Sequence, residues 1–187
     1  MGCTVNFANV DDIIYSCDEL STGGLKTVYL CDKSDLDLVD EIDLTTSPGE
    51  VTITSATNLE TSGVTFVTLG FNNKDGFSNF TDVKTLNADG SASAVPSIQL
   101  EFIRMSSALR NTLEDIARPG AELVAFVETA AGTYHMVGYD FGLYAGTVDG
   151  ASGVARTDKN RYQLTLTGDE NVLAYTMTQG DFNKVNA

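Results

Sequence analysis

The fold is predicted most directly by residues 121–139, which read AELVAFVETAAGTYHMVGY. Apolar side chains occupy both alternating sets of positions from Leu123 to Val127, so an extended strand over 121–129 is apolar on both faces. Such a strand is typical of the middle of a sheet, where each face is covered. A short turn at 130–132 and a second strand over 133–139 follow. The stretch therefore predicts a central β-hairpin.

Alternating or β-branched runs on both sides of this hairpin predict further strands. They cover residues 25–31, 51–54, 64–71, 98–102, 161–167 and 173–177. Strands in this number, without a regular strand–helix repeat, predict a mainly-β fold. We expect a β-sandwich or small barrel with one flanking α-helix and long assembly loops.

The flanking helix is predicted over residues 106–118. Ser106 or Ser107 can cap its first turn, and Pro119-Gly120 ends it. The apolar side chains that share one helical face are Leu109, Leu113 and Ile116.

A single domain is expected over 1–187, with a possible N-terminal arm at 1–24 and long loops at 72–97 and 140–160. The 72–97 segment is rich in Asn, Asp, Gly and Ser, and its length exceeds that of an ordinary connection. It nevertheless carries spaced apolar side chains, which we interpret as contacts made on assembly: Phe77, Phe80, Val83 and Leu86.

Glycines recur at every fourth position in Gly138, Gly142 and Gly146. In an extended chain all three lie on one face, and a strand with a glycine face allows another element to approach closely. We therefore add these three glycines to the candidate assembly contacts.

The chain is strongly acidic, with a net charge of −15. Residues 1–60 hold 12 acidic and two basic side chains. This balance disfavours tight binding to nucleic acid or to an anionic membrane. The acidic run 32–43 is interpreted as a strand or sheet edge, and its carboxylates form either a solvated surface or the lining of a channel. The candidates are Asp32, Asp35, Asp37, Asp40, Glu41 and Asp43.

No motif for catalysis, for a cofactor or for a metal is recognised, so the chain is predicted not to be an enzyme. The single histidine, His135, lies inside a predicted strand, and a lone histidine has no partner group to make it a base or a ligand. Cys3, Cys17 and Cys31 are odd in number and without a CxxC pair, which predicts reduced thiols and synthesis in the cytoplasm.

The order of strand, helix, hairpin, glycine-rich loop and late strand resembles that of tailed-bacteriophage tail-tube proteins and related virion ring proteins. The resemblance is carried by Ala121–Glu128, Tyr134–Gly138 and Asp158–Glu170, and it covers about residues 98–178. It implies a virion protein made in the host cytoplasm, whose sheets join around a ring. The ring would be hexameric or larger, would stack into a tube, would contact neighbouring virion proteins and would pass DNA without binding it specifically.

Two other functions stay open on the sequence. One is a surface-exposed β-sandwich module that binds glycans or attaches to a host cell, although the chain has no Trp for an aromatic platform. The other is a head-decorating protein, which belongs to the same structural class as the ring protein.

Overall fold

The computed structural model describes residues 23–36, 42–44, 49–54, 58–73, 77–154 and 158–185. Within them, eleven strands form one large mixed sheet, and three short helices complete the fold. The strands are β1 (Leu25–Asp32), β2 (Ile42–Asp43), β3 (Glu50–Ile53), β4 (Val67–Thr68), β5 (Asn79–Leu86), β6 (Ala92–Ile103), β7 (Leu123–Thr129), β8 (Tyr134–Val137), β9 (Leu143–Ala151), β10 (Arg161–Gly168) and β11 (Tyr175–Met177). The helices are α1 (Lys33–Leu36), α2 (Ser107–Ile116) and α3 (Gln179–Asn183). The predicted mainly-β fold is confirmed.

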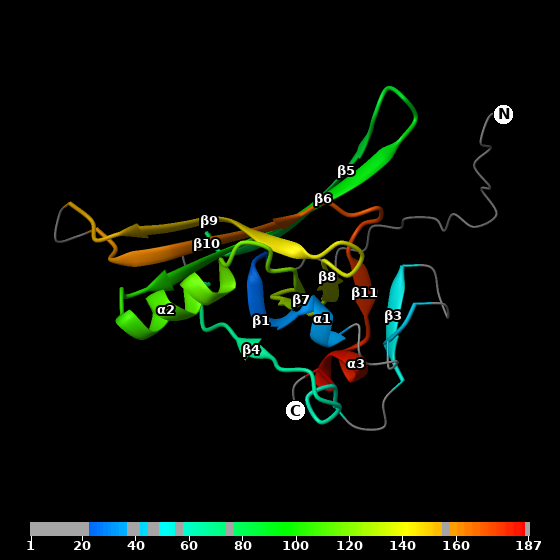
Figure 1. The fold of residues 1–187 in the computed structure, drawn as a ribbon, viewed down its shortest axis with the longest axis horizontal. Coiled ribbons are helices and arrows are strands. Elements are labelled where there is room, and N and C mark those ends of the chain that lie inside the picture. The colour runs from blue at the N-terminus through cyan, green and yellow to red at the C-terminus, as the bar shows by residue number, and fades with distance from the viewer. Residues whose placement is uncertain are drawn as a thin grey trace.

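The sheet turns over on itself into two layers (Figure 1). One layer, called here the four-stranded layer, has the order β9-β10-β6-β5 and is antiparallel throughout. The other contains β1, β7, β8, β11 and β3, and it is joined to the first where Leu123 of β7 pairs with Leu143 of β9. The main apolar core lies between them and includes Leu100, Leu164 and Val127, none of which is exposed.

The hairpin predicted at 121–139 is confirmed as β7 and β8, with Phe126 opposite Met136. Leu123, Ala125 and Val127 face the four-stranded layer, whereas Val124 and Phe126 face a second core that includes Phe182 of α3. Burial on both faces therefore explains why this strand is apolar at every position.

Helix α2 confirms the predicted helix and covers the core side of the four-stranded layer (Figure 1). The Ser106 hydroxyl accepts a hydrogen bond from the Leu109 N–H at 3.2 Å, so Ser106 is the N-cap. Leu113 and Ile116 are buried, as an apolar helical face requires.

The long loop predicted at 72–97 is wrong. Residues 79–86 and 92–97 are paired strands, with Val83 opposite Val95, and Gly90 turns the chain between them at φ +85°. The end of this β5–β6 hairpin projects away from the body of the protein (Figure 1). Its side chains there are mostly exposed, so it lacks the alternation of apolar residues that a half-buried strand shows.

The loop predicted at 140–160 is also wrong, because residues 143–151 form β9, which pairs with β10. Its alternation is broken by glycines and by a register shift opposite Thr165 and Leu166. The strand predicted at 64–71 is reduced to β4, which is two residues long. The possible arm at 1–24 lies outside the described residues, apart from Gly23 and Gly24.

The glycine face predicted for 138–146 is wrong as well. Gly138 and Gly142 lie in a turn at φ +84° and +86°, and only Gly146 is part of β9. A Cβ on Gly138 would lie 2.6 Å from Cγ of Leu143, and one on Gly142 would lie 2.8 Å from Cβ of Glu122. These two glycines therefore allow the turn and the close approach of β9 to β7.

Candidate assembly surfaces

The four-stranded layer ends in two long strand edges. Along the described chain, β5 pairs with β6 alone. At the opposite side of the layer, β9 pairs with β10 along its whole length but meets β7 only at Leu143. Among the residues that the structure describes, no other strand pairs with the outer backbone groups of β5 or of most of β9, so these groups can pair with a further strand.

The layer is staggered. Strand β10 pairs with Ser97–Ile103 of β6, whereas β5 pairs with Ala92–Gln99. Strand β5 is therefore shifted along β6, relative to β10, toward the tip of the β5–β6 hairpin. Stagger of this kind is what a sheet needs in order to close into a ring or barrel with tilted strands.

The predicted assembly contacts of the 72–97 segment separate into two groups. Val83 and Leu86 are 56% and 80% exposed and remain available to a partner. Phe80 is instead half-buried, packs against the main core and contacts the ring of His135 in a tilted arrangement, with 5.5 Å between centroids. Phe77 is half-buried beneath the guanidinium of Arg161, at 5.9 Å. Sequence alone does not separate these pairs, because all four are apolar residues in a polar segment.

Glu101 holds the chain before β5 against the four-stranded layer. Its carboxylate is completely buried and accepts hydrogen bonds from Lys159 at 2.9 Å, Arg161 at 2.7 Å and the Asn72 amide at 3.0 Å. Backbone groups add two hydrogen bonds between the same segments. The Asn72 N–H donates to the Glu101 carbonyl, and the Glu101 N–H donates to Ser78 Oγ. This cluster fixes where the hairpin begins.

Burial of the Glu101 carboxyl acts to raise its pKa, but the hydrogen bonds, led by that from Lys159, outweigh it and lower the pKa to about 2. The carboxylate is therefore charged at neutral pH. No pattern in the sequence points to this cluster, because its members come from three separate segments.

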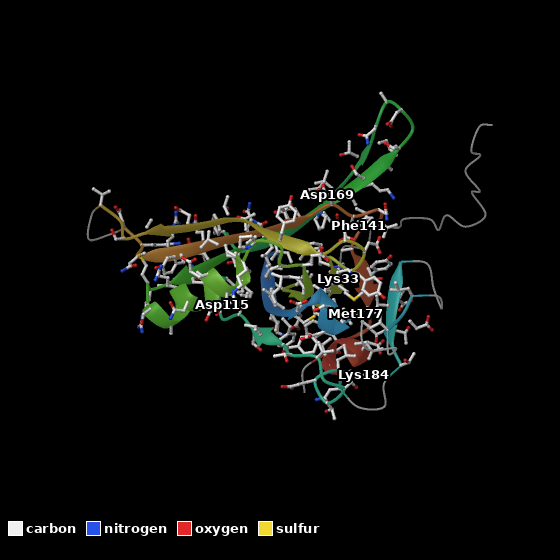
Figure 2. All side chains as sticks on the ribbon, in the orientation of Figure 1. Lys33, Asp115, Phe141, Asp169, Met177 and Lys184 are labelled. Atoms are coloured by element: carbon white, nitrogen blue, oxygen red, sulfur yellow. The ribbon has the colours of Figure 1, made fainter. Side chains whose placement is uncertain are left out.

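A second buried carboxylate, Glu170, holds the turn before β9. It accepts hydrogen bonds from the backbone N–H groups of Asp140 and Phe141 at 3.0 and 3.2 Å, and its own backbone bridges to Ala94 of β6. Burial raises the pKa of its carboxyl. Phe141 and Asp169 lie at the base of the hairpin (Figure 2), beside an open cavity of about 440 Å³.

The acidic candidates are only partly described. Asp32 ends β1, and its carboxylate accepts hydrogen bonds from the N–H and hydroxyl of Ser34 at 2.8 and 2.6 Å. Asp35 lies in α1, so the interpretation of this run as a strand is wrong over Lys33–Leu36. Asp43 lies in the short strand β2. The other three candidates, Asp37, Asp40 and Glu41, lie outside the described residues.

His135 is half-buried, and its Nε2 lies 3.2 Å from the hydroxyl of Thr133. Burial lowers the pKa of its imidazole, so the ring is neutral at pH 7.

Cys31 is a buried free thiol whose pKa is raised to about 12, chiefly by burial and further by Asp35 and Asp32. The other cysteines, Cys3 and Cys17, lie outside the described residues.

Among the side chains that the structure describes, no group of three or more His, Cys, Asp or Glu could hold a metal ion. In the same part of the chain, no helix is long and apolar enough to cross a membrane. Comparisons with protein-family models, with curated proteins and with solved structures found no match.

Proposed function

We propose that the protein is a homo-oligomeric structural subunit of a phage particle, a tail-tube or head–tail ring protein, whose four-stranded layers join edge to edge. The observation that carries the proposal is the pair of open edges, β5 and β9, on opposite sides of one layer. Two different edges make a head-to-tail contact, and repeated contacts of that kind close into a ring when the rotation between copies allows it.

The strand directions support such a junction. Each strand of the layer is antiparallel to its neighbour, so β9 and β5 run in opposite directions across the four strands. When copies are related by rotation about a ring axis, β5 of one copy lies antiparallel to β9 of the next. The two edges are eight and nine residues long, which allows a full ladder of hydrogen bonds.

Both edge strands carry charged side chains, which are expected on strands that pair only with a specific partner. Asp82 and Lys84 lie on β5, and Asp149 lies on β9. Charges on an edge strand disfavour uncontrolled pairing. The net charge of −15 adds a general repulsion between free copies.

Hydrogen–deuterium exchange on the full chain tests the junction directly. Electron microscopy first separates assembled from unassembled material in a concentrated sample to which a crowding agent has been added to promote nucleation. On assembly, we expect slower exchange of the outward N–H groups of β5 and β9, because each gains a carbonyl partner. Helix α2, which lies on the other side of the layer, serves as the control and should not change.

Two results would count against the proposal. One is a protein that stays monomeric at millimolar concentration, with crowding agent and with neighbouring virion proteins present. The other is assembly that leaves exchange along both edges unchanged, since the copies would then be joined through another surface.

A glycan-binding module is the second candidate, and one observation favours it. Phe141 and Tyr144 are 58% and 49% exposed beside the cavity at the base of the hairpin, and exposed aromatic rings can stack on sugars. A glycan array separates the two candidates: a specific glycan whose binding is lost in Phe141→Ala favours the module, whereas an array without binding removes it.

A further inference from the structure

The Glu101 cluster brings an amine and an amide to the same carboxylate oxygen. Asn72 lies in the chain before β5, and Lys159 lies in the chain before β10. The side-chain nitrogens of Asn72 and Lys159 both donate to Oε1 of Glu101, at 3.0 and 2.9 Å. Glu101 itself is completely buried. One buried oxygen therefore connects two side chains that are far apart in sequence.

These three groups are the ones that an exchange of amides requires. A lysine amine is a nucleophile once it has lost a proton, and the side-chain carbonyl carbon of an asparagine can be attacked by it. A carboxylate that touches both nitrogens can accept a proton from the amine and pass it to the leaving group. Because the folded chain holds the groups together, their effective concentration is far above that of free reactants.

We propose that Lys159 and Asn72 form an isopeptide cross-link, with Glu101 as the proton carrier. Nζ of Lys159 bonds to Cγ of Asn72, and the bond between Cγ and Nδ2 of Asn72 breaks. Glu101 passes two protons in turn from the ammonium to the departing nitrogen, which leaves as an ammonium ion. One amide replaces another, so no further reactant is needed. The structure describes the chain before this reaction, with Lys159 still an ammonium group.

The surroundings of the cluster support the reaction. The backbone N–H of Asn72 donates to the Glu101 carbonyl at 2.6 Å, which fixes the asparagine at its backbone as well as at its side chain. Arg161 binds the other carboxylate oxygen, Oε2, at 2.7 Å. The Lys159 side chain is 37% exposed, which gives the departing ammonium ion a path to water.

The cross-link would act within one chain and goes beyond the proposed function, because it does not depend on assembly. It would tie the chain before β5 to the chain before β10 and close a loop that contains β5, β6, α2, β7, β8 and β9. A covalent bond of this kind restricts the unfolded chain, as a disulfide does. The base of the β5–β6 hairpin would then be held covalently.

Intact-mass spectrometry of the full chain tests the proposal. Freshly purified protein is compared with protein kept folded for days and with protein kept unfolded in urea for the same time. We expect the folded sample alone to accumulate a species lighter by one ammonia. Protease digestion of that species should release a branched peptide that joins Lys159 to Asn72. Loss of ammonia without the branched peptide would indicate ring closure at an asparagine and would overturn the proposal, as would an unchanged mass.

Two variants and a matched control assign the roles. Lys159→Arg keeps a cation on Glu101 but removes the nucleophile, so it should form no cross-link. Glu101→Gln removes the proton carrier and should slow the reaction by about a hundredfold. Lys184 likewise pairs with a carboxylate, that of Asp181 at 3.2 Å, outside the Glu101 cluster. Lys184→Arg should therefore cross-link as wild type does. A Lys159→Arg protein that still gives the lighter species would contradict the assignment.

A third variant tests the proton carrier by an increase in rate. Burial acts to raise the pKa of the Glu101 carboxyl, and the donors that outweigh burial include Arg161. Without this donor the carboxylate is a stronger base, and a base whose pKa is nearer to the working pH transfers protons more efficiently. Arg161→Met should therefore cross-link faster than wild type. An unchanged rate in Arg161→Met would show that Glu101 does not carry the proton.

Discussion

Glu101 is the residue on which the start of the β5–β6 hairpin depends. A buried carboxylate is stable only when its charge is paired and its oxygens are hydrogen-bonded, and Lys159, Arg161 and Asn72 provide both conditions. The two cations are themselves about one-third exposed, so they can turn to water when the carboxylate is removed.

Glu101→Ala should lower the free energy of unfolding by about 3 kcal/mol. This value is the lower end of the range for breaking a buried ion pair, because the cations left behind remain hydrated. Urea unfolding measures the change. Glu114→Ala is the matched control: its pair with Arg110 is exposed, and its loss should cost less than about 1 kcal/mol. Equal effects in the two variants would show that the Glu101 cluster does not stabilise the fold.

The same carboxyl predicts a dependence of stability on pH. Its pKa is about 2 in the folded protein, below the value near 4.3 of an unfolded chain. The unfolded state therefore binds the proton first on acidification, and about 3 kcal/mol of stability present at pH 7 is lost between about pH 5 and pH 2. Unfolding free energies measured over this range should fall less steeply in Glu101→Gln than in wild type. Both proteins keep Glu170, so its titration cancels, and parallel pH profiles would contradict the prediction.

At the scale of elements, the sequence predicted most reliably those that are buried. Strand β7 is predicted because burial of both faces gives it a continuous apolar run, and helix α2 because the core imposes a helical period on its apolar side chains. Strand β5, the part of β6 before Ile98 and strand β9 were missed, because their outer parts contact little of the core and a polar exposed strand resembles a loop in sequence. The three glycines at 138–146 were recognised, but their backbone conformation depends on how β9 meets β7.

Gly138→Ala tests the turn that brings β9 to β7. The new Cβ would lie 2.6 Å from Leu143 and 2.9 Å from the Leu123 carbonyl, in a backbone conformation that Ala adopts poorly. We expect a loss of more than about 2 kcal/mol in the free energy of unfolding. Gly90→Ala is the control, since Gly90 has a similar φ of +85° but open space around it, and its cost should stay near 1 kcal/mol. Equal losses would mean that backbone strain alone, without crowding, decides both.

At the scale of the whole molecule, net charge opposes the proposed assembly. Each copy carries −15, so copies that meet edge to edge repel one another through their total charge. Screening shortens the range of this repulsion from about 30 Å at 0.01 M salt to about 8 Å at 0.15 M. The protein concentration needed for half assembly, measured by light scattering, should therefore fall as sodium chloride is added. A rise would show that attraction between opposite charges drives the contact instead.

The sequence by itself determined the mainly-β class, the central hairpin, helix α2 and the acidity, because periodic burial and composition are local properties of the chain. Only the tertiary structure decided that the sheet turns over into two layers and that β5 and β9 become open edges. It also decided that Phe80 is packed while Val83 and Leu86 are exposed, and that three distant segments meet at Glu101. Each of these depends on which strands pair, and pairing joins residues far apart in sequence, which leave no pattern within any single segment.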